Sequence, residues 1–383
     1  MVRALYIHWP FCARKCPYCD FNSHVRAVVD QRTWREALLA DLAHEAEASG
    51  GGELTSIFFG GGTPSLMPPA TVAALIDAAG RHWRLAPGIE ITLEANPSSV
   101  EAARFADLAA AGVNRVSLGL QALDDAALRL LGRLHDVAEG LAALETAQRR
   151  FARVSFDLIY ARPGQTPEQW QRELARALLF GTEHLSLYQL TIEPGTRFAS
   201  DARTGTLSPL PDDPAAELFT LTREITASAG LPAYEVSNHA RPGSESRHNL
   251  AYWRYEDYTG IGPGAHGRRL GMATTRHRKP ENYLAAVGRS GHGTLAETPL
   301  TPGDQAVEAL LMGLRLREGV DLAGLGQRFG FAPEALLAPA KLALHERLGL
   351  VRRESSRVIV TEAGVPVLDA LLGELVAGEL LAA

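Results

Sequence analysis

The stretch Tyr6-Ile-His-Trp-Pro-Phe-Cys-Ala-Arg-Lys-Cys-Pro-Tyr-Cys-Asp-Phe21 decides how the rest of this chain is interpreted. Its cysteines, Cys12, Cys16 and Cys19, have the spacing C-x3-C-x2-C and are the only three in 383 residues. Three thiolates hold three irons of a [4Fe–4S] cluster, whereas complete ligation by protein requires a fourth ligand. The spacing therefore predicts a cluster with one iron open to a small molecule.

Two simpler interpretations compete with the cluster. The three cysteines with His8 or His24 match the composition of a structural Cys3His zinc site. Zinc ligands, however, usually come as two separated pairs, not as three cysteines within one short loop. Three unrelated thiols are the other alternative. The apolar approach Trp9-Pro10-Phe11 and the neighbouring Tyr18 favour a cluster shielded from solvent.

Composition limits the classes of function. An apolar content of 46%, with 21% charged residues, is ordinary for a globular protein. The net charge of −6 argues against a nucleic-acid partner, which would call for a basic surface. No apolar run reaches the roughly 18 residues of a membrane span, which leaves only transient contact with a membrane surface. The N-terminus shows no signal-peptide pattern, so we expect a cytoplasmic protein whose thiols stay reduced. The oligomeric state is left open.

The first half of the chain alternates strands and helices. Alternating apolar residues predict strands at 2–8, 57–59, 89–94, 113–120, 153–160 and 184–190. Helices are predicted at 33–49, with Thr33 as the N-cap, and at 69–83, 98–111, 124–132, 136–150 and 167–180. Six successive β/α units predict a parallel sheet curved into a barrel or a partial barrel.

Polar or glycine-rich elements follow each predicted strand. They are the cysteine loop, Gly60–Thr63, Glu94 with Asn96, Ser117 with Gln121, Asp157, and Tyr188 with Gln189. Ligand sites of such folds lie at the carboxyl ends of the strands, so these groups predict a cofactor site there. Asp157 falls where an interior strand is normally apolar, so it needs a partner, either Arg133 or ribose hydroxyls of a ligand.

The rest of the chain changes character. We expect a barrel at 1–190, a segment at 191–300 that closes one side of the site, and a C-terminal domain at 301–383. Helices are predicted at 214–229, 303–318, 321–328, 333–348 and 362–377, with a hairpin of strands at 351–353 and 357–360. This order is typical of a winged-helix domain. The segment has no basic recognition helix, which disfavours DNA binding.

The segment His248-Asn-Leu-Ala-Tyr-Trp253 is the second candidate site. A neutral imidazole is a common ligand of metals and haem iron, and aromatic side chains stack on flat macrocycles. A histidine beside tryptophan and tyrosine is otherwise most often a core residue. His24, His135, His239, His266 and His277 leave other ligand choices open.

With these motifs, the chain resembles the radical S-adenosylmethionine (SAM) family of oxygen-independent coproporphyrinogen III oxidases and, more closely, its haem-chaperone branch, the HemW-type proteins. The resemblance rests on the cysteine stretch and on the segments Phe59-Gly-Gly-Gly-Thr-Pro64, Gly112-Val-Asn-Arg-Val-Ser-Leu-Gly-Leu-Gln121, Asp157-Leu-Ile-Tyr160 and His248–Trp253. It implies an α/β fold, a partial (β/α)6 radical SAM barrel with a helical, winged-helix-like C-terminal domain.

The resemblance also implies cofactors and their sites. The cluster would be held by the three cysteines, and SAM would be bound at Tyr6, Tyr18, Gly61, Gly62, Thr63 and Glu94. In the oxidase branch a second SAM would contact Gln121, Arg133, Asp157 and Tyr188. Radical SAM proteins cleave SAM reductively to a 5′-deoxyadenosyl radical.

Two departures separate this chain from the oxidases. They carry a further cysteine two residues after the third, where this chain has Phe21, and an N-terminal extension precedes their first strand. The resemblance therefore implies a haem chaperone that delivers haem to respiratory haem proteins, with His248 as the haem-associated ligand. The alternatives are a coproporphyrinogen III oxidase that decarboxylates propionates, and a zinc-stabilised winged-helix regulator.

Overall fold

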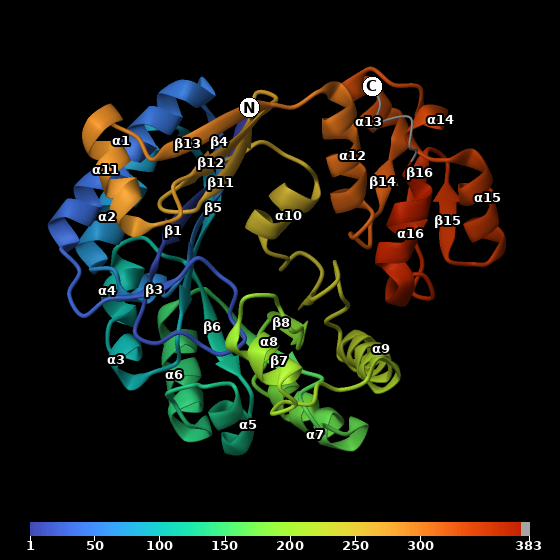
Figure 1. Cartoon of the computed structure of the whole chain (residues 1–383), viewed down its shortest axis with the longest axis horizontal. Coiled ribbons are helices and arrows are strands. Elements are labelled where there is room, and N and C mark those ends of the chain that lie inside the picture. Colours follow the sequence, from blue (N-terminus) through green and yellow to red (C-terminus); the bar gives the residue numbers. More distant parts are fainter. Residues whose placement is uncertain (377–383) are drawn as a thin grey trace.

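The computed structural model describes residues 1–376, so the end of the helix predicted at 362–377 and of the domain predicted at 301–383 lies outside the described residues. Figure 1 shows a curved sheet with helices on its outer side, and a separate group of helices formed by the C-terminal region. The short helix α10 lies between these two parts.

The main sheet confirms the predicted β/α alternation. Six parallel strands follow each other in sequence order: β1 (Val2–Trp9), β4 (Gly52–Gly61), β5 (Arg84–Ala95), β6 (Arg115–Gln121), β7 (Arg153–Tyr160) and β8 (His184–Gln189). A seventh, β10 (Tyr258–Ile261), pairs in parallel with the other side of β1. The edge strands are β9 (Asn238–Ala240) and β13 (Thr294–Pro299), so the sheet is an open partial barrel.

Helices cover the outer face of this sheet. They are α1 (Gln31–Ser49), α2 (Pro69–His82), α3 (Ser99–Ala102), α4 (Phe105–Ala110), α5 (Asp125–Leu130), α6 (Val137–Arg150) and α7 (Pro167–Leu178). The helix predicted at 98–111 is thus two short helices. The predicted cap Thr33 is wrong: Asp30 accepts hydrogen bonds from the backbone N–H groups of Arg32 and Thr33, so α1 begins two residues earlier.

The segment between the barrel strands and the C-terminal region extends the sheet. It contains α8 (Arg197–Arg203), α9 (Asp212–Ser228), α10 (Arg247–Trp253), α11 (Pro280–Ser290) and the antiparallel strands β11 (His266–Arg269) and β12 (Met272–Arg276), which connect β10 to β13. Strands β2 (Phe11–Cys12) and β3 (His24–Val25) form a small parallel pair around the cysteine loop.

The C-terminal region has a hydrophobic core of its own. It consists of α12 (Pro302–Gly313), β14 (Val320–Asp321), α13 (Leu322–Phe329), α14 (Pro333–Leu336), α15 (Pro339–Arg347), β15 (Val351–Glu354), β16 (Arg357–Val360) and α16 (Leu368–Leu375). The helix predicted at 333–348 is split because Pro339 disfavours a helical conformation in the residue before it. The predicted hairpin is present, and β14 adds a third strand.

Polar contacts fix the C-terminal region to the loop after α10. Arg254 forms an ion pair with Glu318 at 2.8 Å, and Arg328 donates to the Tyr255 carbonyl at 2.8 Å. The Tyr255 hydroxyl donates to Glu308. Within residues 1–376, no helix is both long enough and apolar enough to cross a bilayer.

Candidate functional site

The cysteine loop lies at the carboxyl edge of the sheet. All three cysteines are free and half-buried. The Thr63 hydroxyl, after β4, donates to Cys12 Sγ at 3.4 Å, and Arg133, after β6, donates to Cys16 Sγ at 3.2 Å. Thr63 follows the end of β4, as the predicted convergence of strand ends requires, whereas Arg133 lies in the loop between α5 and α6.

The sulfur positions do not suit a single zinc ion. With Zn–S bonds of about 2.3 Å at tetrahedral angles, bound sulfurs lie roughly 3.8 Å apart. The three Sγ atoms do not all lie within 4.8 Å of one another. His8 offers no free nitrogen, because its ring bonds to the Tyr6 hydroxyl at 3.0 Å and to the Asn22 carbonyl at 2.9 Å. The absence of a compact sulfur trio thus disfavours a zinc ion held by the three cysteines and His8, and it leaves the cluster as the interpretation.

Packing explains the glycines of the Gly-Gly-Gly-Thr turn. A Cβ on Gly61 would lie 2.5 Å from the His8 ring, and one on Gly62 would lie 2.7 Å from the Phe11 carbonyl oxygen. Gly61 also has a φ of +108°, which L side chains rarely adopt. These glycines let the turn pack directly against β1 and the start of the cysteine loop, which brings Thr63 to Cys12.

Two carboxyl groups share the mouth of the partial barrel. Burial, with the nearby charge of Asp157, raises the pKa of Glu94 to about 8. Burial also raises the pKa of Asp157 to about 6, although Ser186 and Ser117 donate hydrogen bonds to it. The Gly61 N–H donates to Glu94 at 3.2 Å. The mouth thus favours a ligand that brings positive charge, because a cation would stabilise the ionised carboxylates.

The residues predicted to contact a second SAM do not lie together in the structure. Arg133 is not paired with Asp157: besides Cys16 it donates to Asn96 and, at 3.0 Å, to the Gly119 carbonyl. Gln121 folds back over Gly119 beside Arg133, where a Cβ on Gly119 would lie 2.7 Å from its side-chain nitrogen. The hydroxyls of Ser117 and Ser186 take the place of the expected cation at Asp157.

His248 lies on α10, inside the concave face of the sheet. Its Nδ1 bonds to the Ser56 hydroxyl at 3.0 Å and its Nε2 to the Tyr252 hydroxyl at 2.9 Å. Burial lowers the pKa of the ring to about 3, so the imidazole is neutral. Phe58 stacks on it with ring centroids 4.8 Å apart. Coordination of iron by His248 would therefore require one of these hydrogen bonds to break.

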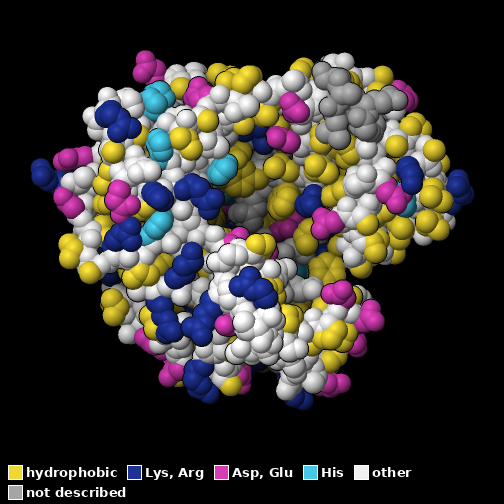
Figure 2. Space-filling view, viewed as in Figure 1, with side chains coloured by type: hydrophobic (Ala, Val, Ile, Leu, Met, Phe, Trp, Pro, Cys, Tyr) yellow, Lys and Arg dark blue, Asp and Glu magenta, His cyan; other side chains and the backbone are white. Residues whose placement is uncertain are grey.

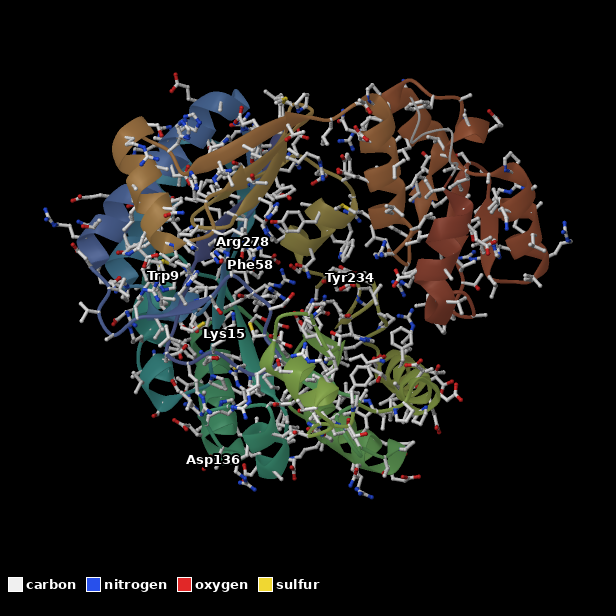
Figure 3. All side chains as sticks on the ribbon, in the orientation of Figure 1. Trp9, Lys15, Phe58, Asp136, Tyr234 and Arg278 are labelled. Carbon is white, nitrogen blue, oxygen red and sulfur yellow. The ribbon has the colours of Figure 1, made fainter. Side chains whose placement is uncertain are left out.

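Glu90 is a site residue that sequence reasoning missed. It is buried on β5, and its carboxylate accepts from the His248 N–H and the Ser246 hydroxyl, both at 3.3 Å, at the first turn of α10. Arg153 neutralises it at 2.6 Å. Phe58 and Tyr234, both labelled near α10 in Figure 3, contact this helix: Phe58 stacks on His248, and the Asn249 side chain donates to the Tyr234 hydroxyl at 3.3 Å. The sequence offered one indication of the role of Glu90, which is the alternation of polar residues at positions 90, 92 and 94 of the predicted strand.

A groove of about 1150 Å³ opens between α10, the end of β8 and the C-terminal region. Figure 2 shows a hollow near the centre of this face with hydrophobic side chains at its border, and hydrophobic residues also make up most of the lining of the groove. Tyr188, Tyr252, Trp253 and Tyr258 line it from the sheet side, and Met312 and Val367 from the C-terminal side. Tyr188 thus lies at the groove, while Arg133 and Gln121 lie at the cysteine loop.

Comparisons with known proteins agree with this geometry. The radical SAM superfamily matches residues 6–177, and the HemN C-terminal domain matches residues 300–367. Heme chaperone HemW of Mycobacterium tuberculosis is 36% identical over 97% of this chain and 94% of its own length, and that of Escherichia coli is 41% identical over 73% and 75%. The chain belongs to the HemW family of radical SAM proteins.

Further relatives and one solved structure extend this family assignment. Radical S-adenosyl methionine domain-containing protein 1, mitochondrial, of Mus musculus is 44% identical over 83% of this chain and 74% of its own length. The structure of coproporphyrinogen III oxidase (HemN) from Escherichia coli covers 97% of this chain and 89% of its own, with a TM-score of 0.81 at 23% identity. That similarity concerns the fold, and it matches both the partial barrel and the helical C-terminal region.

The residues present fit the cofactors that radical SAM membership implies. Half-buried thiols with hydrogen-bond donors at two sulfurs suit a cluster whose potential depends on such bonds. When bound, the cluster and SAM would supply the chemistry of a reductively generated radical. In this chain Thr63 and Arg133 stabilise thiolate charge, and Glu94 is placed to accept a bond from a cationic ligand group. The SAM contacts at Tyr6, Tyr18, Gly61, Gly62, Thr63 and Glu94 stay predictions.

Glu94→Gln should have opposite effects on stability and on SAM binding. Because its pKa of about 8 in the folded state exceeds the ordinary 4.5, Glu94 lowers stability progressively as pH rises from about 4.5 to 8. The variant should therefore be more stable at pH 8, by on the order of 2–4 kcal/mol, and less dependent on pH. SAM affinity should fall roughly 10- to 100-fold, because a bond to a charged group is lost.

Urea unfolding at pH 5 and pH 8, with SAM titration of the reconstituted protein, measures both effects. The exposed Glu224→Gln, on α9, is the control and should change neither. Equal stability of Glu94→Gln and the parent protein at pH 8 would show that Glu94 is not held in its protonated form.

Proposed function

We propose that this protein is a haem chaperone that binds a [4Fe–4S] cluster and SAM at the barrel mouth and haem in the neighbouring aromatic groove. The observation that carries the proposal is the position of His248–Trp253, the HNxxYW segment. Its histidine is anchored inside the barrel by Ser56 and Glu90, while Tyr252 and Trp253 line the groove. One short helix therefore connects the two sites.

The groove has the properties that a metalloporphyrin requires. Its lining is mainly aromatic and aliphatic, and flat macrocycles gain stacking and burial free energy on such surfaces. Tyr252 and Tyr258 pack edge to face at 4.4 Å, which holds both rings in place. His248 supports the groove by fixing the Tyr252 hydroxyl. Arg315, at the rim, provides a cation for a propionate.

The family relatives support the assignment of haem as the cargo, since those from bacteria are named heme chaperones. We propose that the recipients are respiratory haem proteins and that transfer occurs in the cytoplasm, with transient contact at a membrane surface where such recipients reside. The three free thiols support a cytoplasmic location, because a reducing compartment keeps them available as cluster ligands.

Anaerobic titration of the reconstituted protein with haem and with coproporphyrinogen, side by side, tests this function. We expect saturable haem binding, and no conversion of coproporphyrinogen to protoporphyrinogen over many turnovers with SAM and a reductant present. Sustained decarboxylation without haem binding would replace the chaperone function by the oxidase function.

His248→Ala should weaken haem binding by roughly tenfold, because it releases Tyr252 and removes the stacking partner of Phe58. The absorption spectrum of the haem that still binds should keep the parent's spin state, since His248 acts through Tyr252. Haem titration of the two proteins measures both quantities. The exposed His82→Ala, on α2, serves as control. Unchanged haem affinity in His248→Ala would remove His248 from the haem site.

A further inference from the structure

The groove contains one side chain suited to haem iron that no motif identified. Its described lining holds no histidine or cysteine, and the nearby His248 has both ring nitrogens engaged. Met312, on α12, lines the groove from the C-terminal region and is half-buried. A methionine thioether is an established axial ligand of haem iron.

We propose that Met312 ligates the haem iron, so that the C-terminal region completes the haem site. This inference rests on the haem-binding function proposed above. It adds to that function the identity of an iron ligand and a role for α12, which lies some 60 residues after the HNxxYW segment.

The placement of α12 against α10 supports the proposal. Gly313, next to Met312, lies so close that a Cβ added there would be 3.8 Å from the Trp253 carbonyl oxygen and 2.5 Å from Val320. Helix α12 thus packs against the end of α10, and Met312 and Trp253 both line the groove. Arg254, just after α10, also pairs with Glu318, which follows α12.

The groove also has a place for the charged edge of haem. Arg315 lies three residues after Met312, just past the end of α12, and donates to Asp369 at 2.9 Å. The Asp369 side chain is 90% exposed, so this ion pair is weak and a haem propionate can compete for the guanidinium. Haem with its iron at Met312 and a carboxylate toward Arg315 would lie against the aromatic side of the groove.

A thioether suits temporary storage of haem. It is neutral and is a weaker donor than a thiolate, and it raises the reduction potential of haem. A histidine of the recipient protein can replace the thioether on the iron, and because the thioether is neutral no proton has to be added to it before it leaves. The proposal thus explains how the groove holds haem for transfer.

Nuclear magnetic resonance of methionine methyl groups tests the proposal directly. The chain has four methionines, Met1, Met67, Met272 and Met312, so methyl-labelled protein gives four assignable signals. On addition of ferrous haem and carbon monoxide under anaerobic conditions, carbon monoxide supplies the sixth ligand and makes the iron low-spin. The Met312 methyl should then move strongly upfield, because a ligated methyl lies over the porphyrin ring.

Met312→Leu should lose the upfield signal, and its haem affinity should fall roughly tenfold, which corresponds to about 1.4 kcal/mol. Met272→Leu, at a half-buried site on β12, is the matched control and should change neither. Haem binding with all four methyl signals near their original positions would overturn the Met312 assignment and leave the haem function intact. Absence of haem binding by the parent protein would overturn both.

Discussion

Cys16→Ser should abolish cluster assembly and SAM binding while leaving the apoprotein folded. The cysteines are half-buried free thiols and form no disulfide, so exchange of sulfur for oxygen removes little packing. Two thiolates cannot hold three irons, and SAM loses the iron that it would chelate. We expect SAM affinity to fall by roughly 100-fold or more. Loss of a residue that only hydrogen-bonds to a metal ligand typically lowers metal affinity or activity by about 10- to 100-fold, and loss of a ligand itself should have a larger effect.

Iron and sulfide analysis after anaerobic reconstitution, together with urea unfolding of the apoprotein, measures these effects. Ala13→Ser places a hydroxyl at an exposed position in the same loop without removing a thiol, and it should assemble the cluster normally. A Cys16→Ser protein with full iron, sulfide and SAM binding would show that the trio is not the ligand set.

Arg276→Met should be the most destabilising single substitution outside the site. Arg276 is fully buried on β12, with its Nε 3.3 Å from Asp41 and its Nη2 2.5 Å from Glu45, both on α1. Burial opposes ionisation of Glu45, but the positive charges of Arg276 and Arg269 hold its pKa at about 2. Removal of Arg276 leaves buried carboxylates poorly compensated, which should cost about 3–5 kcal/mol.

Urea unfolding monitored by circular dichroism at pH 7 measures this loss. Arg289→Met, at an exposed position of α11, is the matched control and should change stability by less than roughly 0.5 kcal/mol. A loss below about 1 kcal/mol for Arg276→Met would show that the buried ion pairs do not hold α1 against β12.

Local sequence patterns predicted the barrel strands well because their apolar alternation is strong and each is followed by a helix. The strand at 153–160 and the helix start at Pro167 coincide with the structure. Strand β10 was missed. Its four residues are followed by Gly262-Pro263-Gly264, which is typical of a loop, and its partner β1 lies some 250 residues earlier in the chain. Such pairing leaves no local signal.

The candidate site likewise contains contacts that the sequence predicted and contacts that it did not. The cysteine spacing and the strand-end rule predicted that Cys12 and Thr63 would converge. Arg133 was expected at Asp157, but it bonds to Cys16 instead. The partners of His248 were not predictable, because Ser56 and Glu90 belong to strands far away in the sequence and show only ordinary polar alternation. The groove was not predictable either, since it depends on how the C-terminal region packs against α10.

The central claim is that three sulfurs leave one cluster iron free for SAM. Mössbauer spectroscopy of the iron-57 reconstituted protein, before and after addition of SAM, tests it most directly. The account predicts that one iron in four changes its isomer shift toward higher coordination while the other three stay constant. Four irons that do not respond to SAM, or a protein that takes up zinc in place of iron and sulfide, would contradict it.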